Sequence, residues 1–229
     1  MKVNNKMNIK GFFIGVYSFF SLTIAIILMY IFKQHILFIR KKWAASMIYI
    51  IGINIKKFGS LDEKADIIFL NHNSMLDIIL LDYLHPKEIA WVTNMKFAKI
   101  PFFGLIFRLP NLILIDPNNK SSLRTLLKRS QQEIKNRRVI GIFPEATRGK
   151  DNEIIPFKQG ARMITECLKL KVQTIVLTNT RERLDTKRLT ASSGLVKIIY
   201  FDTFTPESKD WFKETEILMK DTYKQYAKD

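Results

Sequence analysis

The stretch that decides the fold is residues 66–77, DIIFLNHNSMLD. Its first part, Asp66–Leu70, is a short apolar run with the length of a buried strand. A polar loop follows, and beyond Ser74 the chain changes to an apolar helical pattern. A strand, a loop and a helix in this order form the repeating unit of an α/β domain. The stretch therefore predicts that class of fold.

The same alternation continues from Leu61 to the end of the chain. Six runs are candidate strands: Asp66–Leu70, Ile89–Thr93, Leu112–Ile115, Val139–Phe143, Thr174–Thr178 and Val196–Phe201. Three patterns are candidate helices: one capped by Ser122, one over Lys158–Leu168 and one over Ser208–Tyr226. The pattern predicts an α/β fold with a mixed sheet flanked by helices.

A separate apolar tract precedes this domain. Gly11 to Phe32 are 22 residues without a charge, and a helix of that length at ~1.5 Å per residue covers the ~30 Å hydrocarbon core of a bilayer. A signal peptide is the rival interpretation, but its apolar region spans about 7–15 residues and ends near small residues. This tract ends in Met29-Tyr30-Ile31-Phe32. We therefore expect a retained membrane anchor, whose nearly balanced basic flanks leave its orientation open.

A second uncharged stretch, Trp43 to Ile55, lies between two lysine pairs. It is too short to span a bilayer but suits an interfacial or re-entrant helix. A helix packed on the globular core is the alternative that the pattern leaves open. We expect two units: N-terminal membrane-anchoring helices over residues 1–60 and an α/β domain over residues 61–229.

Composition indicates a folded, basic protein. Of 229 residues, 47% are hydrophobic and 25% are charged, which matches an ordinary core-forming chain and argues against global disorder. The formal net charge of +16 implies an anionic partner. Nucleic acid would explain this charge but not the apolar tract, and no basic–aromatic stacking platform is evident. Cys167 is the single cysteine, which excludes an internal disulfide and a cysteine-clustered metal site.

The loop after the first candidate strand carries His72, with Asp77 five residues further on. Five residues turn through about 500° on a helix, so the two side chains cannot share a helix face. If His72 stays in the loop and Ser74 caps the helix, the Asp77 carboxylate can reach back to the imidazole. That contact would make the other ring nitrogen a general base at neutral pH. The alternative is that Ser74 and Asp77 form a variant capping box that serves only the helix end.

A second polar cluster, Phe143-Pro144-Glu145-Ala146-Thr147-Arg148-Gly149-Lys150, directly follows a candidate strand. The planar fork of Arg148 suits a phosphate, with the Thr147 hydroxyl and Lys150 in support. Taken alone, such a cluster after a strand is more often simply a solvated charged loop. Phe157-Lys158-Gln159-Gly160-Ala161 then opens the next helix, where Gly160 and Ala161 offer a smooth surface for close packing.

Together the motifs are more specific than any one of them. In chain order they are Asn71-His72 with Asp77, Pro101-Phe102-Phe103-Gly104, Leu112-Ile113-Leu114-Ile115-Asp116, Phe143-Pro144-Glu145-Ala146-Thr147-Arg148, and Phe157-Lys158-Gln159-Gly160-Ala161. In this order and spacing they resemble the 1-acylglycerol-3-phosphate acyltransferase (lysophosphatidic acid acyltransferase) family, over about residues 40–200.

The resemblance implies transfer of a fatty acyl group from acyl-CoA or acyl carrier protein to the sn-2 hydroxyl of lysophosphatidic acid, giving phosphatidic acid for phospholipid synthesis. It implies His72 as the general base and Asp77 as its orienting partner, with Glu145, Thr147, Arg148 and Lys158 as substrate-binding residues and with neither cofactor nor metal. It also implies a bacterial inner-membrane enzyme whose active site faces the cytoplasm. Attack of a hydroxyl on a thioester needs a base and oxyanion stabilisation, but no covalent enzyme intermediate.

The sequence departs from the family pattern in three places. Asp116-Pro117 stand where the family commonly has an arginine, with Lys120 as a speculative substitute. Ala146 stands where the family has glycine; if a positive φ is required there, alanine costs about 1–2 kcal/mol. The usual proline pair is also absent near Gln173 and Val176. These departures leave acylation of another lysolipid or of glycerol 3-phosphate as the nearest alternative. A non-catalytic protein that binds anionic lipid is the alternative from another class, although lipid binding alone needs neither His72 nor Asp77.

Overall fold

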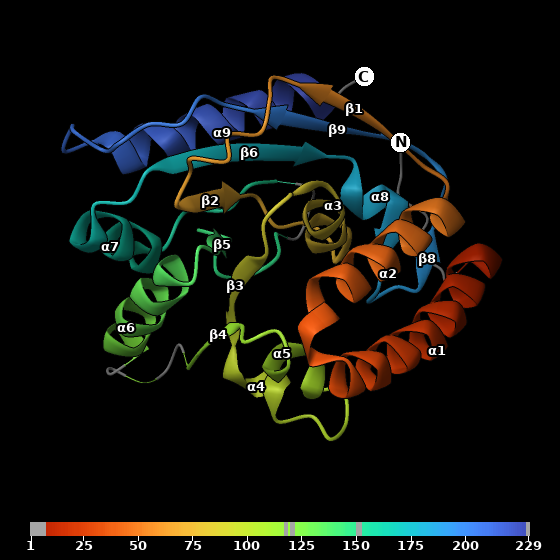
Figure 1. Ribbon diagram of the computed structural model, residues 1–229. Coiled ribbons are helices and arrows are strands. Elements are labelled where there is room, and N and C mark those ends of the chain that lie inside the picture. Colours follow the sequence, from red (N-terminus) through yellow and green to blue (C-terminus); the bar gives the residue numbers. More distant parts are fainter. Residues whose placement is uncertain (1–7, 117–118, 120–121, 150–152, 228–229) are drawn as a thin grey trace.

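The computed structural model describes residues 8–116, 119, 122–149 and 153–227. Its centre is a seven-stranded sheet in the order β1-β9-β6-β2-β5-β3-β4 (Figure 1). The strands are β1 (Ile53–Phe58), β2 (Ile67–Leu70), β3 (Ile89–Asn94), β4 (Ile113–Ile115), β5 (Val139–Ile142), β6 (Val172–Thr178) and β9 (Gly194–Tyr200), beside a separate hairpin of β7 (Leu184–Asp185) and β8 (Thr190–Ala191). The pairings in the large sheet are parallel except that of β6 with β9. The sheet is mixed, as the sequence predicts.

Helices cover both faces of the sheet (Figure 1). They are α1 (Ile9–Ile31), α2 (Ile36–Ile51), α3 (Leu76–Leu84), α4 (Met95–Ala98), α5 (Leu105–Arg108), α6 (Ser122–Lys135), α7 (Gln159–Leu168), α8 (Thr180–Arg183) and α9 (Trp211–Ala227), with a short 3₁₀ helix over Lys33–His35. The apolar residues of α2 and α3 share one core cluster, and those of α6, α7 and α9 share the other. α1 lies outside α2, along the edge of the molecule (Figure 1).

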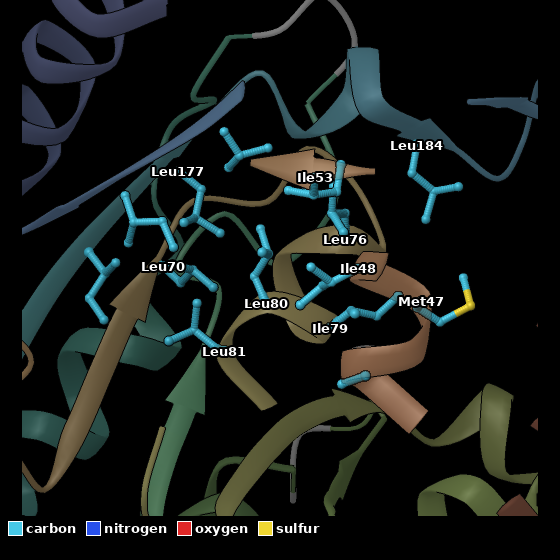
Figure 2. Close-up of a cluster of buried hydrophobic side chains, with 14 of the residues drawn as sticks. Met47, Ile48, Ile53, Leu70, Leu76, Ile79, Leu80, Leu81, Leu177 and Leu184 are labelled. Atoms are coloured by element: carbon cyan, nitrogen blue, oxygen red, sulfur yellow. The ribbon is translucent and has the colours of Figure 1, made fainter. Parts of the chain in front are cut away.

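The central strand β2 shows why both faces must be covered. All four of its residues are buried. Successive side chains of a strand point to opposite faces. Accordingly Ile68 and Leu70 pack in the cluster with α2 and α3, shown in Figure 2, while Ile67 and Phe69 pack in the cluster with α6, α7 and α9. The continuous apolar run that predicted this strand is the signature of a strand with helices on both sides.

The structure confirms each of the six expected strands, with shifted ends. The helix expected over Lys158–Leu168 is α7, and the one expected over Ser208–Tyr226 is α9, which begins later at Trp211. The sequence did not predict the strand β1, the β7–β8 hairpin or the four-residue helices α4, α5 and α8. The hairpin strands are only two residues long, too short for an apolar period to register.

The expected helix over Trp43–Ile55 has the wrong bounds. The observed helix α2 begins at Ile36 and ends at Ile51, because Gly52 adopts a left-handed conformation (φ 78°) and caps it. Ile53 to Ile55 then belong to β1, which pairs with β9. Met47 and Ile51 are 1% and 0% exposed in the core shown in Figure 2. This packing supports the alternative of a helix on the globular core, although Phe38 and Tyr49 on its other side stay exposed.

α1 is the one described helix long and apolar enough to cross a membrane, judged by length and composition. It also packs on the domain. The Asn8 side chain caps the helix and exchanges hydrogen bonds with the backbone of Ala191 in β8, at 2.9 and 3.2 Å. Further along, Ser21 accepts a hydrogen bond from the Trp43 indole at 3.1 Å. Ile26 and Met29, nearer the end of α1, are buried.

Candidate active site

The candidate site begins at the carboxyl end of β2, between β5 and β6. Open α/β sheets bind their ligands at this end of the strands. Asn71, the first residue after β2, exchanges two hydrogen bonds with the backbone of Leu177 in β6, at 2.8 and 2.9 Å. These bonds fix the start of the loop, because both partners are buried. The loop therefore leaves the sheet in one defined direction.

His72 and Asp77 meet as the sequence suggested. The His72 Nδ1 atom lies 3.0 Å from Asp77 Oδ2. The same carboxylate oxygen accepts the backbone N–H groups of Asn73 and Ser74, each at 2.8 Å. α3 starts at Leu76, whose N–H donates to Ser74 Oγ at 3.1 Å. The N-cap of α3 is Met75, whose side chain makes no capping hydrogen bond, so the cap expected at Ser74 is one residue off. The pairing interpretation is the one that the contacts support, because a single Asp77 oxygen holds both the loop backbone and the imidazole.

The second nitrogen of His72 faces the other motif. A carboxylate only accepts hydrogen bonds, so pairing with Asp77 assigns the Nδ1–H tautomer and leaves the lone pair on Nε2. Arg148 Nε lies 3.4 Å from this Nε2 and is placed to donate to it. The His72 side chain is 14% exposed and that of Asp77 is 0% exposed. The pair thus presents one reachable basic nitrogen over a fully buried carboxylate.

Glu145 connects the two motifs through hydrogen bonds to the backbone. Its Oε1 accepts the backbone N–H of His72 at 2.7 Å, and its Oε2 accepts that of Ile155 at 3.0 Å. The side chain is fully buried. Burial raises the pKa of Glu145 to about 7, although both backbone hydrogen bonds act to lower it. Both carboxylate oxygens are therefore engaged within the protein.

The remaining expected site residues are Arg148, Thr147 and Lys158. Arg148 is partly buried, burial lowers its pKa, and its terminal nitrogen donates to Thr186 Oγ1 in the β7–β8 hairpin at 3.3 Å. Thr147 is exposed beside it. Lys158 is exposed where α7 begins, and its backbone N–H donates to Pro144 at 2.8 Å. Pro117, Lys120 and Lys150 lie outside the described residues.

Two features of the site were not expected from the sequence. The first is Thr186, which comes from a hairpin too short to predict. The second is the Phe143 ring, which stacks on the His72 ring with centroids 3.9 Å apart and planes 20° apart. Phe143 belonged to the second motif, but nothing in its spacing indicated contact with a histidine far away in the chain. Among the described residues, no group of three or more His, Cys, Asp or Glu side chains could hold a metal.

Comparison with known proteins identifies the family of this chain and proteins with the same fold. A family model described as Acyltransferase matches residues 52–178. A 1-acyl-sn-glycerol-3-phosphate acyltransferase of Helicobacter pylori is 38% identical over 175 residues, covering 75% of this chain and 74% of that protein. One from Saccharomyces cerevisiae is 27% identical, covering 71% of this chain but only 56% of the yeast protein. The crystal structure of a 1-acyl-sn-glycerophosphate (LPA) acyltransferase from Thermotoga maritima has the same fold, with a TM-score of 0.78 and 20% identity over 96% of this chain and 98% of that one.

Proposed function

This chain belongs to the acyltransferase family, and from that membership we propose that it moves a fatty acyl group onto the sn-2 hydroxyl of 1-acyl-glycerol 3-phosphate. The donor is a thioester, acyl-CoA or acyl carrier protein, and the product is phosphatidic acid for phospholipid synthesis. The observation that carries the proposal is the His72–Asp77 pair, 3.0 Å apart, with Arg148 at the free ring nitrogen. This arrangement sets a general base beside a cation that suits a phosphate.

The reaction follows from the position of the base. His72 Nε2 takes the proton of the acceptor hydroxyl while the hydroxyl oxygen bonds to the thioester carbonyl carbon. The oxyanion that forms then collapses, the carbon–sulfur bond breaks, and the imidazolium returns its proton to the leaving thiolate. Asp77 holds Nδ1 throughout and stabilises the imidazolium. The protein needs no covalent intermediate for this sequence.

Arg148 connects acceptor binding to the base. Its Nε lies 3.4 Å from His72 Nε2, which is where the acceptor hydroxyl has to bind. A phosphate is a stronger partner for a guanidinium than a neutral imidazole is. The acceptor phosphate therefore draws Arg148 away and frees Nε2. Thr147 and Lys158, both exposed, add a hydroxyl and an ammonium group to the phosphate site, and Glu145 acts by holding the backbone of His72.

The test of the base is His72→Ala in an assay with lysophosphatidic acid and each thioester donor, with the product identified by its mass. We expect the rate to fall by about 10²-fold to 10⁴-fold, with folding intact. His35→Ala is the matched control, because His35 is exposed in the 3₁₀ helix between α1 and α2 and should leave the rate unchanged. Full activity of His72→Ala would end the general-base assignment.

The test of the phosphate site is Arg148→Lys, which keeps the charge but loses the planar fork. We expect acceptor use to weaken much more for lysophosphatidic acid than for a lysolipid without the free phosphomonoester. The donor KM should change little. If both acceptors slow equally, Arg148 is structural or donor-facing, and another lysolipid becomes the better substrate.

The membrane is the remaining partner. The apolar helix α1 and the nine lysines and arginines of residues 1–60, which include no acidic residue, support docking of that segment on an anionic bilayer. The charge of this segment does not orient it, so we propose from the family resemblance alone that the active site lies on the cytoplasmic face of a bacterial inner membrane. Residues 61–229 act as the acyltransferase domain, to which β1 adds an edge strand.

Removal of residues 1–32 tests this docking, with binding to phosphatidylglycerol vesicles as the measurement. α2 keeps Phe38 and Tyr49 exposed, so we expect weak binding that high salt abolishes. A truncated protein that stays free of vesicles at low salt would show that α2 has no interfacial role.

A further inference from the structure

We propose that Phe143 and Trp91 are positioning residues that fix the plane of the His72 ring, and that Arg40 of α2 holds Trp91 in place through Asp82. The inference rests on the proposed role of His72 as general base. It goes beyond that role because it names a route from α2, the helix next to the apolar α1, to the reacting nitrogen.

The route starts with two stacked rings. Phe143 lies on the His72 ring, with centroids 3.9 Å apart and planes 20° apart. Trp91 of β3 lies near Phe143, with centroids 5.3 Å apart and planes 8° apart. Trp91 is 2% exposed, so it has no freedom to move aside. The His72 ring therefore stacks on Phe143, which in turn stacks on Trp91, inside the protein.

This stack fixes the orientation of the His72 ring plane, which the hydrogen bond to Asp77 alone does not. One hydrogen bond at Nδ1 fixes the position of one atom, but the ring can still tilt about that contact and carry Nε2 off its target. A ring face packed at 3.9 Å blocks the tilt. A displacement of 1 Å at a reacting group can cost about 10²-fold in rate. The aromatic face also favours the imidazolium that forms during the reaction, because a cation over a ring is attracted to it.

Trp91, at the other end of the stack, is held by a hydrogen bond to the charged residue Asp82. The Trp91 indole N–H donates to Asp82 Oδ1 at 2.9 Å. Asp82, near the end of α3, also accepts three hydrogen bonds from the Arg40 guanidinium, at 2.7, 2.8 and 3.2 Å. Arg40 is 8% exposed, although its place in the sequence suggested only a basic flank of the apolar tract. A fork buried in this way is geometrically specific.

The contacts therefore form one chain: Arg40 in α2, Asp82 in α3, Trp91 in β3, Phe143 after β5 and His72 after β2. Each link is a hydrogen bond or a ring contact between different elements. A shift of α2 relative to α3 changes the support of Trp91 and, through it, the tilt of the His72 ring. The position of α2 on the domain therefore affects the orientation of His72 Nε2 toward the acceptor hydroxyl.

Nuclear magnetic resonance of the wild-type protein in detergent tests the stack without any reaction. The chain has three histidines. The ring-proton signals of His72 are therefore the ones that are absent from the spectrum of His72→Ala. We expect these protons to be shifted upfield by the ring currents of Phe143. His72 ring protons at ordinary positions would overturn the inference, whatever the activity of the protein. Upfield protons in an inactive protein would instead count against the proposed function alone.

Kinetics then test the positioning role. Phe143→Leu keeps an apolar side chain but loses the ring face, and we expect kcat to fall by about 10-fold to 100-fold while KM for both substrates stays near its wild-type value. Phe143→Tyr keeps the face and should retain most of the activity and the upfield shift. Equal kcat in Phe143→Leu and wild type would contradict the inference.

Trp91→Phe tests the hydrogen bond to Asp82, and the chain offers a matched control. Trp211 of α9 is 4% exposed and donates its indole N–H to Glu166 Oε1 at 2.9 Å. It lies in the other core cluster from Trp91. Both substitutions remove one such bond and some volume. We expect Trp91→Phe to lower kcat several-fold and move the His72 ring protons, whereas Trp211→Phe lowers stability alone. If the two variants lose kcat equally, Trp91 is only a core residue.

Discussion

Asp77 Oδ2 accepts the Nδ1–H of His72 and two backbone N–H groups. Asn at this position keeps one acceptor oxygen but loses the negative charge. We therefore expect Asp77→Asn to reduce kcat by about 10²-fold or more and also to lower the free energy of unfolding by about 1–2 kcal/mol, the usual size of a helix-cap loss. Both are measured on one preparation, by kinetics and by urea unfolding.

Asp62→Asn is the control for that pair of measurements, because Asp62 also accepts a backbone N–H, from Lys64 at 2.9 Å. Its own N–H bonds to Gln173 at the amino end of β6, opposite the end of the strands where the site lies. Neither kcat nor stability should change much in the control. A loss confined to stability in Asp77→Asn would mean that Asp77 only supports the loop before α3. A loss confined to kcat would mean that its hydrogen bonds to the loop backbone do not stabilise the fold.

Ala146 shows how far one residue can be foreseen. The sequence predicted strain if the position required a positive φ, and the structure has φ 58° there. The left-handed conformation costs a non-glycine residue roughly 1–2 kcal/mol, and glycine returns about 0.5–1 kcal/mol through its flexible unfolded chain. Ala146→Gly should therefore raise the unfolding midpoint slightly. Ala45→Gly, within α2, should lower the free energy of unfolding by about 1 kcal/mol, and changes of the same sign in the two variants would contradict the strain at Ala146.

Glu145 predicts a pH dependence with a definite sign. Its pKa is about 7 in the folded protein, raised by burial from an ordinary value of 4.5. Between these pH values the folded protein binds more protons than the unfolded chain, so the free energy of unfolding falls as pH rises. Urea unfolding of wild type and Glu145→Gln from pH 4 to about 8 should show this fall only in wild type. Parallel curves would contradict the assignment.

Among single residues, the sequence predicted the contact between His72 and Asp77, but it did not predict that Glu145 and Phe143 contact His72. The residue types of His72, Asp77 and Arg148 indicate a base, a carboxylate and a phosphate-binding cation. Only His72 and Asp77 are close enough in the sequence for their contact to be predicted from spacing. Glu145 and Phe143 contact His72 from more than 70 positions away, at a separation of 73 for Glu145. Only the pairing of β2 with β5 brings their loops together, and no local pattern encodes that neighbour.

At the scale of elements, β1 and α2 illustrate a conflict between local pattern and packing. The run INIKKF of β1 is apolar at its start and basic in its middle, which suits an edge strand with one neighbour, β9. Its apolar start continues the pattern of α2, so the two merged into one expected helix. The boundary depends on Gly52, whose left-handed conformation ends the helix, as glycine does at many helix ends.

Two substitutions in α2 test whether one face of this helix belongs to the core. Ile51 is 0% exposed in the core, whereas Tyr49, two residues earlier, is 86% exposed. Ile51→Ala should lower the free energy of unfolding by about 2–5 kcal/mol, while Tyr49→Ala should change it by less than about 0.5 kcal/mol. Vesicle binding should respond in the opposite order. An unfolding energy insensitive to Ile51→Ala would mean that α2 is not part of the core.

For the whole molecule, the apolar N-terminal helix was predicted correctly, but its relation to the domain was not. Length and hydropathy describe α1 alone. In the structure its start bonds to Ala191, its middle packs Phe19 on Phe103 with centroids 5.4 Å apart, and Trp43 bonds to Ser21. A helix held at successive points along one domain lies against that domain, so the face left exposed is the one available to lipid.

Gly11 and Gly15 in α1 separate this packed arrangement from a helix that stands away from the domain. A Cβ on Gly11 would overlap the backbone oxygen of Leu189, whereas a Cβ on Gly15 would make an ordinary contact, 3.6 Å from the Leu189 side chain. In an isolated membrane helix, alanine at either position would be tolerated alike. In the packed helix, Gly11→Ala must push α1 off the β7–β8 hairpin that carries Thr186, the partner of Arg148. We therefore expect Gly11→Ala to lower the unfolding midpoint and weaken use of the acceptor, with vesicle binding retained. Gly15→Ala should raise helix stability by up to about 1 kcal/mol and leave kinetics unchanged, and identical behaviour of the two variants would mean that α1 is not seated on the domain.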